Sequence, residues 1–87
     1  MEIEYSKKFI KEFKKCQPKV KSAFYKRLEL FIKDKYHPLL HNHSLSGRLK
    51  DYRSINVDGD YRVLFQEFNN GQTVYFVVIG SHSQLYS

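Results

Sequence analysis

The spacing of hydrophobic positions changes midway along the chain, which predicts helices in the first half and strands in the second. Residues 2–5 alternate polar and apolar side chains, as a short strand does. Ser6 is a suitable N-cap for a first helix, and Pro18 can open a second one. Pro38 should end the second helix, because it disfavours helical geometry in the residue before it. Apolar residues recur within both helices at the spacing of one helical face: Phe9, Ile10, Phe13, Val20, Phe24, Leu28, Phe31 and Ile32.

Three strand-like runs follow, and their turns predict how they pair. The runs are about Leu49 to Val57, Tyr61 to Phe68 and Gln72 to Ile79. Asn70-Gly71 signals a two-residue hairpin turn between the last two runs. At residues 58–60, a three-residue loop with Gly59 at positive φ keeps polar and apolar faces separate and places Asn56 opposite Arg62. The predicted pairs are Val57–Tyr61, Ile55–Val63, Phe65–Phe76 and Val63–Val78, with Leu64, Val77 and Ile79 on the opposite face.

These elements predict an α+β fold in one domain over residues 1–87. A strand and two helices precede a three-stranded antiparallel meander, and residues 81–87 form a short turn or helix that returns over the sheet. The helices should cover the apolar face of the sheet. The other face would then be open and polar, with Ser54, Asn56 and Arg62 on it.

The charge balance favours a polyanionic partner. The chain has 15 Lys and Arg against 9 Asp and Glu, a net charge of +6. An excess of this size attracts nucleic acid or acidic protein without sequence specificity. Cys16 is the single cysteine, so no internal disulfide is possible, and a buried filler is the expected role. The chain shows neither an apolar signal segment nor a membrane span, and a cytoplasmic protein is expected.

Two histidines are the leading candidates for chemistry. RNA cleavage by 2′-hydroxyl attack needs a base, an acid and a positive charge near the phosphate. His43, His82, Asp60 and Arg62 supply those groups, and an aromatic ring from Tyr61 or Tyr86 can stack on a base. The alternatives are ordinary: loop histidines are usually solvated, and Asp60 is also a good turn residue. A metal site of His37, His41 and His43 is weakly indicated, since it lacks a fourth ligand, and no metal or cofactor is expected.

Three segments in the second half resemble the RelE/ParE superfamily of toxins, and YafQ-type toxins most of all. The segment His43-Ser44-Leu45-Ser46-Gly47-Arg48-Leu49-Lys50-Asp51-Tyr52-Arg53-Ser54 is similar to the H-x-L-x-G-x-x-x-x-Y-R pattern of YafQ-type toxins. Asp60-Tyr61-Arg62-Val63-Leu64-Phe65 resembles a strand found across the superfamily, and Ile79-Gly80-Ser81-His82-Ser83-Gln84-Leu85-Tyr86 resembles its C-terminal segment. Together they span residues 43–86, about half of the chain.

The resemblance implies a metal-independent endoribonuclease that cleaves mRNA in the ribosomal A site, on a small RNase-type fold. His43 and His82 fall on the catalytic histidines of the family, Asp60 on its acidic residue and Arg62 on an arginine that contacts phosphate. Tyr86 falls on the C-terminal aromatic residue. The resemblance also implies a cognate antitoxin, and an oligomeric toxin–antitoxin complex that binds DNA through the antitoxin.

Two positions depart from the YafQ-type pattern. Asn56 stands where those toxins carry a further histidine, and an asparagine cannot transfer protons near neutral pH. Facing Arg62, it suits a phosphate- or ribose-binding role. Tyr61 replaces a tryptophan and keeps stacking possible. Arg48, Lys50, Arg53 and the lysines of the first helix are expected to dock ribosomal RNA.

Two other functions fit the same fold and charge. A ParE-type toxin would bind DNA gyrase without catalysis, although it would not need His43, Asp60 and His82. An inactive relative could serve only as an RNA-binding or corepressor module, and Asn56 is the residue that points that way.

Overall fold

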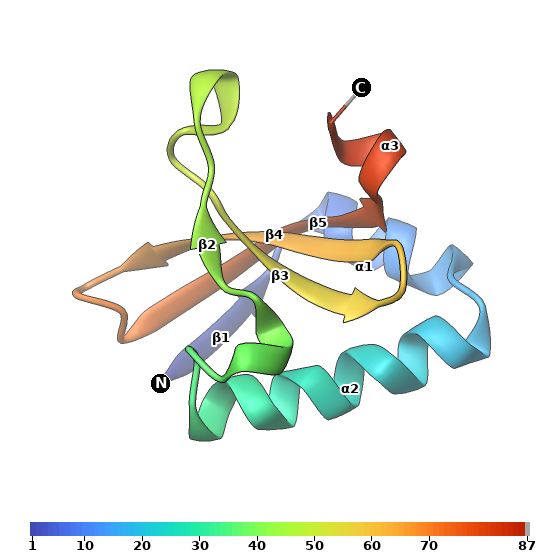
Figure 1. Cartoon of the computed structure of the whole chain (residues 1–87), viewed down its shortest axis with the longest axis horizontal. Helices are drawn as coiled ribbons and strands as arrows, with labels where there is room; N and C mark the ends of the chain where they lie inside the picture. The colour runs from blue at the N-terminus through green and yellow to red at the C-terminus, as the bar shows by residue number, and fades with distance from the viewer. Residues whose placement is uncertain (87) are drawn as a thin grey trace.

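The computed structural model describes residues 1–86, which form a five-stranded sheet with two helices packed on one face (Figure 1). The elements in chain order are β1 (Glu2–Tyr5), α1 (Lys7–Lys15), α2 (Pro18–Lys33), the 3-10 helix η1 (Pro38–Leu40), β2 (His43–Ser44), the 3-10 helix η2 (Gly47–Leu49), β3 (Arg53–Asp58), β4 (Tyr61–Phe68), β5 (Thr73–Ser81) and α3 (His82–Tyr86). The strand order is β1-β5-β4-β3-β2, with β1 parallel to β5 and the other pairs antiparallel.

The α+β fold and the order of its elements are as predicted, with one addition. The segment before β3 contributes a short fifth strand, β2, where the sequence suggested only a loop. The predicted strand from Leu49 begins later, at Arg53, because residues 47–49 form η2. Residues 82–86 form the expected short helix, α3. Within the described chain, none of the helices is long and apolar enough to cross a membrane.

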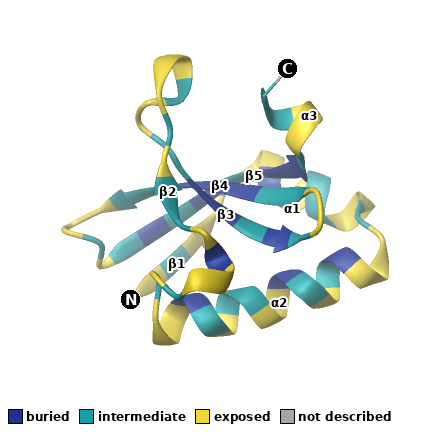
Figure 2. Ribbon diagram, viewed as in Figure 1, coloured by how far each residue is buried: buried dark blue, intermediate teal, exposed yellow. Residues whose placement is uncertain are grey.

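Aromatic rings fill the layer between the helices and the sheet. Phe24 and Phe31 of α2 and Phe65 and Phe76 of the sheet are each at most 1% exposed. Their rings meet mostly edge to face, for example Phe31 with Phe65 at 5.3 Å between centroids, an arrangement that favours aromatic pairs. Figure 2 shows the buried positions on the strands and on the side of α2 that faces them. Ile10 and Ile32, expected beside the core, are instead exposed on the outer sides of their helices.

Ser6 ties α1 to the sheet. As predicted, its hydroxyl caps the helix by accepting from the Phe9 amide at 2.8 Å. The same hydroxyl donates to the carbonyl of Val77, and the Ser6 amide donates to Phe76. Ser6 is almost fully buried, and these bonds satisfy it.

A β-bulge corrects part of the predicted register in the second hairpin. Phe65 pairs with Phe76 as expected, but Val63 pairs with Ile79 and not with Val78, because the register shifts beyond Phe65. The extra residue in β5 reverses which side chains face the helices from there onward. Ile79 therefore belongs to the core, at 3% exposed, although the sequence placed it on the open face.

The first hairpin contains a second register shift. Ile55 pairs with Val63, and Asn56 with Arg62, as predicted. The predicted pair of Val57 with Tyr61 is wrong, since Tyr61 pairs with Asp58 across the shift. Gly59 has the expected positive φ, +48°. Asn56 and Arg62 thus face each other on the open side of the sheet.

Candidate active site

A pocket of about 340 Å³ lies on the open side of the sheet, where α3 returns toward β2. It is lined by His41, His43, Leu45, Arg62, His82 and Tyr86. These residues come from three segments: the chain around β2, the start of β4, and α3. The three segments that the sequence singled out therefore converge at one place.

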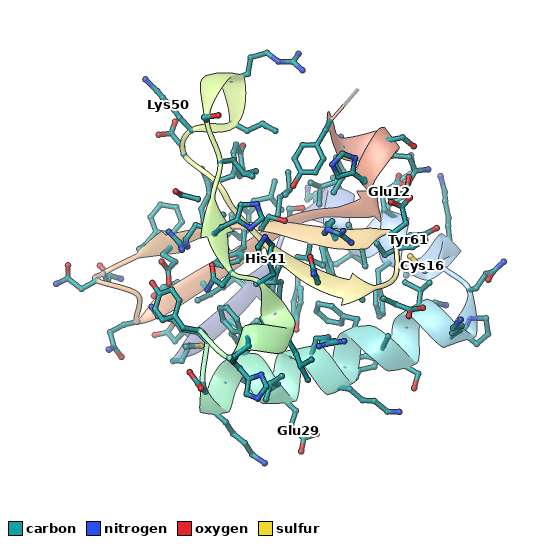
Figure 3. The ribbon with its side chains drawn as sticks, viewed as in Figure 1. Glu12, Cys16, Glu29, His41, Lys50 and Tyr61 are labelled. Carbon is teal, nitrogen blue, oxygen red and sulfur yellow. The ribbon has the colours of Figure 1, made fainter. Side chains whose placement is uncertain are left out.

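His43 is held by the backbone of the loop before it. Its ring nitrogen Nδ1 lies 2.8 Å from the carbonyl oxygen of His41. A carbonyl only accepts, so the bond requires that Nδ1 carry the hydrogen. In the neutral ring, Nε2 then has the free lone pair. His41 adopts a left-handed backbone conformation, with φ of 48°, at the end of η1. This rare conformation places its carbonyl beside His43 (Figure 3 labels His41).

His82 is positioned by the first turn of α3. Ser81 and Gln84 form a capping box: the Ser81 amide donates to Gln84 Oε1 at 2.8 Å, and the Gln84 amide donates to Ser81 Oγ at 3.3 Å. The His82 amide donates to the carbonyl of Asp60 at 2.9 Å. These bonds fix α3 to the end of β5 and to the turn before β4.

Tyr86 anchors the other end of α3 over the sheet. Its hydroxyl donates to Ser54 Oγ at 3.2 Å, and Ser54 is fully buried. Its ring centroid lies 4.6 Å from that of His82, one helical turn away. Gly80 allows this close return, because a Cβ there would lie 3.1 Å from Leu85 and from Gln84.

Arg62 supplies the positive charge of the pocket, but it is folded onto its own turn. Its guanidinium donates to the carbonyl of Gly59 at 2.7 Å and to that of Tyr61 at 3.0 Å. The Gly59 bond is exposed to solvent, so exchanging it for a phosphate contact costs little.

Asn56 carries a buried oxygen without a partner. Its Oδ1 makes no hydrogen bond within the described chain. A buried acceptor of this kind costs stability unless a donor reaches it. The register places Asn56 beside Arg62, next to the pocket.

The other predicted residues lie outside this pocket. The main chain of Asp60 bonds to His82, but its carboxylate does not line the pocket, and Tyr61 lines a separate cavity beside Cys16. Arg53 points back toward the helix side, with Nε 2.9 Å from Asn42 Oδ1. Arg48 and Lys50 are exposed in the loop around η2, as the labelled Lys50 in Figure 3 shows.

The sequence interpretation missed two residues of this pocket, His41 and Leu45. His41 was considered only as a weak metal ligand, yet its ring lies 4.7 Å from that of His43. The close spacing of His41 and His43 in the sequence is the signal that could have identified it. No group of three or more His, Cys, Asp and Glu in residues 1–86 is placed to hold a metal ion.

Comparisons with known proteins agree with this geometry. Escherichia coli YafQ superposes with a TM-score of 0.82 at 22% identity, over 99% of this chain and 98% of that one. The same toxin in its DinJ–YafQ complex superposes with a TM-score of 0.73 at 24% identity, over 99% of this chain and 98% of that one. A metal-bound toxin from Helicobacter pylori gives 0.76 at 32% identity, over 99% of both chains. A YoeB/ParE toxin from Agrobacterium tumefaciens gives 0.78 at 12% identity, over 94% of this chain and 99% of that one.

Comparison of the sequence with protein families identifies the family of this chain. No curated protein matches the chain. Residues 1–87 match one family, described as the bacterial toxin of the type II toxin-antitoxin system, YafQ. Because the match spans every residue, the chain belongs to the YafQ family of bacterial type II toxins.

Proposed function

We propose that this toxin is an endoribonuclease that cleaves mRNA on the ribosome, with the pocket of His43, Arg62 and His82 as its active site. The observation that carries the proposal is the pairing of two histidines with an arginine around one hollow on the open face. A toxin that acts by binding alone has no need of this combination.

His43 acts as the base in this proposal. Its Nδ1–H is engaged by the His41 carbonyl, so the lone pair on Nε2 is free to accept a proton. Nε2 takes the proton of the ribose 2′-hydroxyl, and the 2′-oxygen attacks the adjacent phosphorus. Asp60, the other candidate base, contributes its backbone carbonyl to the position of His82.

His82 acts as the acid. As the bond from phosphorus to the 5′-oxygen breaks, protonated His82 donates its proton to that oxygen. The products are a 2′,3′-cyclic phosphate and a free 5′-hydroxyl. No metal takes part in this scheme. Arg62 turns from the Gly59 carbonyl to the phosphate and stabilises the charge that builds on its oxygens.

The neighbouring residues hold the nucleotide. Asn56 offers its unpartnered oxygen to a donor on the RNA, such as a ribose hydroxyl. The Tyr86 ring, beside His82, is a platform for a base. The exposed Arg48 and Lys50 dock ribosomal RNA, and the net charge of +6 makes this binding sensitive to salt. The RNA contacts expected of Tyr61 and Arg53 would lie outside the pocket, since Tyr61 lines the cavity beside Cys16 and Arg53 bonds to Asn42.

A cognate antitoxin is the second partner in this proposal. E. coli YafQ, which shares this fold, has been solved in its complex with DinJ. We propose that this chain also binds an antitoxin, in an oligomeric complex that binds DNA through the antitoxin. The cytoplasm, where ribosomes and mRNA are found, is its proposed location.

The test is cleavage of mRNA on programmed ribosomes by wild type, His43→Ala and His82→Ala. Wild type should cut at in-frame codon positions, and each alanine variant should lose about a hundredfold or more in rate, which is typical for removal of an acid or base. His37→Asn is a matched control, because His37 lies in the same loop outside the pocket and caps η1 with a side chain that asparagine can replace.

Two results would overturn the proposal. If folded wild type makes no cuts, the nuclease assignment is wrong, and inhibition of gyrase supercoiling becomes the next assay. If the alanine variants cut as fast as wild type, the pocket is not the active site.

A further inference from the structure

The strand that carries His43 is the shortest in the sheet and lies at its edge. β2 has only two residues, and β3 is its neighbour in the sheet. Two register pairs join these strands, His43 with Ser54 and Ser44 with Arg53. Neither pair includes Asn42, the residue before β2. Backbone pairing of this length holds a strand weakly, so His43 needs other contacts to stay in place.

The side chain of Asn42 supplies such contacts. Its Oδ1 accepts from Arg53 Nε at 2.9 Å, and its Nδ2 donates to the main-chain carbonyl of Lys35 at 2.9 Å. The first bond joins the residue before β2 to β3, and the second joins it to the segment that follows α2. Both bonds are partly buried, and a hydrogen bond shielded from water is electrostatically stronger than an exposed one. We refer to the side chains of Asn42 and Arg53 as the clamp.

The amide group of Asn42 matches both of its partners. The oxygen of an amide only accepts and its nitrogen only donates, and here the oxygen meets an N–H and the nitrogen meets a carbonyl. Asn42 also lies between the two residues of another bond, because His43 Nδ1 donates to the carbonyl of His41. A displacement of Asn42 would therefore move both partners of the bond that fixes the His43 ring.

Arg53 holds Asn42 from the helix side of the sheet. Its register partner in β4 is Phe65, which is fully buried in the core, and directly opposed residues share a face of the sheet. The guanidinium carbon of Arg53 lies 5.7 Å from the centre of the Tyr36 ring, so the cation is engaged there as well as at Nε. The next residue, Ser54, bonds to Tyr86 beside the pocket. Arg53 is thus placed to support the site from behind and not to enter it.

We infer that the clamp positions His43 for proton abstraction, with Asn42 and Arg53 acting through His43 and neither touching the RNA. The inference rests on the proposed role of His43 as the base. It gives Arg53 a role other than the RNA contact that the sequence suggested. Since both are positioning residues, their loss should slow the chemical step and leave the binding of ribosomes unchanged.

The first measurement compares Asn42→Ala with wild type in cleavage of mRNA on programmed ribosomes. The kcat should fall by about tenfold, because the base is displaced, and the KM should stay within about twofold. The ring-nitrogen chemical shifts of His43 in the free toxin should show that the hydrogen no longer resides mainly on Nδ1. Because the shifts are measured without ribosomes, they test the clamp even if wild type fails to cleave RNA, a result that would overturn only the proposed function.

Two substitutions of Arg53 separate positioning from RNA binding. Glutamine carries an N–H as many bonds from the main chain as Nε of arginine, but it has no charge. Arg53→Ala should lower the kcat as Asn42→Ala does, whereas Arg53→Gln should recover it to within about threefold of wild type. The double alanine variant should be little slower than Asn42→Ala alone, because both substitutions remove the same contact.

Glu67→Ala is the matched control. Glu67 Oε2 lies 2.8 Å from Lys35 Nζ in a partly buried ion pair, so this variant releases the side chain of the residue whose carbonyl binds Asn42. It should lower the melting temperature as Asn42→Ala does. Its kcat and its His43 shifts should nevertheless equal those of wild type, because the clamp is intact.

Three results would overturn the inference. The first is a wild-type kcat or wild-type His43 shifts in folded Asn42→Ala. The second is a loss of kcat in Glu67→Ala as large as that in Asn42→Ala, which would mean that general loosening of the loop is responsible. The third is an equal rise in KM and an equal loss of salt dependence in Arg53→Gln and Arg53→Ala, which would assign Arg53 to an RNA phosphate. If Asn42→Ala does not fold, the two Arg53 variants and their His43 shifts decide.

Discussion

The two faces of the sheet show how the same strands serve stability on one side and chemistry on the other. The face under α1 and α2 is packed with interlocking aromatic rings, most of them fully buried. The open face carries histidine, arginine, asparagine and serine side chains around a hollow. Polar groups are satisfied on the covered face, whereas the open face leaves the buried Oδ1 of Asn56 without a partner in the described chain.

The contrast is clearest along β3, where neighbouring residues alternate between the two faces. Ile55 and Val57 enter the core and are at most 1% exposed. Ser54 supports Tyr86 of α3, and Asn56 keeps a buried oxygen unpartnered. Because the side chains from Ser54 to Val57 point alternately to the two faces, a substitution on one face should leave the other largely unchanged. Substitutions on the covered face should therefore lower stability, whereas substitutions on the open face should lower activity.

The largest effect should come from Phe76→Ala on the covered face. Phe76 is fully buried and its ring contacts those of Phe9, Phe24, Phe31 and Phe65, so truncation should cost about 3–5 kcal/mol of unfolding free energy. Urea denaturation measures this loss. The matched change on the open face is Asn56→Ala, which removes an unsatisfied group and should change stability by no more than about 0.5 kcal/mol while lowering cleavage. Equal losses of stability in both variants would contradict the division between the faces.

A smaller effect is expected at His41, where backbone and side chain have separate roles. His41→Val places a β-branched residue in a left-handed conformation, at a cost of about 1–2 kcal/mol, and should displace the carbonyl that fixes His43. Cleavage on ribosomes should fall by about tenfold. His41→Gly favours the same φ and keeps the carbonyl, so it should lose only about twofold to threefold.

The nitrogen chemical shifts of the His43 ring compare the His41→Val and His41→Gly variants independently of cleavage activity. They report which ring nitrogen carries the hydrogen, and they should change in His41→Val but not in His41→Gly. If both variants lose the same activity with the His43 tautomer unchanged, then the His41 ring matters and its carbonyl does not.

The sequence was sufficient for the fold because its signals were local. The Ser6 cap, Pro18 in the first turn of α2 and the apolar spacing placed both helices, and Gly59 at positive φ set Asn56 opposite Arg62. The shift beyond Phe65 could not be predicted, because a β-bulge depends on contacts such as that of Ser6 with Val77, distant in the sequence.

The candidate site was predictable for residues that family motifs carry, and less so for the rest. His43, Arg62 and His82 do meet in one pocket. The predicted register put Tyr61 on the helix-covered face, where it does pack against the core and line the cavity beside Cys16, although the family motif suggested RNA contact. Residue types could not identify the His41 carbonyl as a partner of His43, because main-chain acceptors leave no mark in a sequence.

The smallest effect concerns Cys16, which lies where the two faces meet. It is half-buried against the core and not a fully buried filler, and it lines a cavity with Tyr61 and Gly80. Burial raises the pKa of its thiol, Lys21 opposes this, and Glu12 adds to it. At neutral pH the thiol should therefore react with iodoacetamide more slowly in the folded protein than in urea.

The raised pKa of the Cys16 thiol also determines how stability changes with pH. Because the pKa of this thiol is higher in the folded than in the unfolded chain, its contribution to the free energy of unfolding is full below the unfolded pKa. That contribution is lost as pH rises toward the folded pKa. Between neutral and alkaline pH, wild type should lose slightly more unfolding free energy than Cys16→Ala, which removes the titrating group. Cys16 does not line the active-site pocket, so Cys16→Ala should cleave mRNA at the wild-type rate. Faster alkylation in the folded state would contradict the raised pKa of the thiol. A loss of cleavage in Cys16→Ala would mean that Cys16 contributes to the reaction.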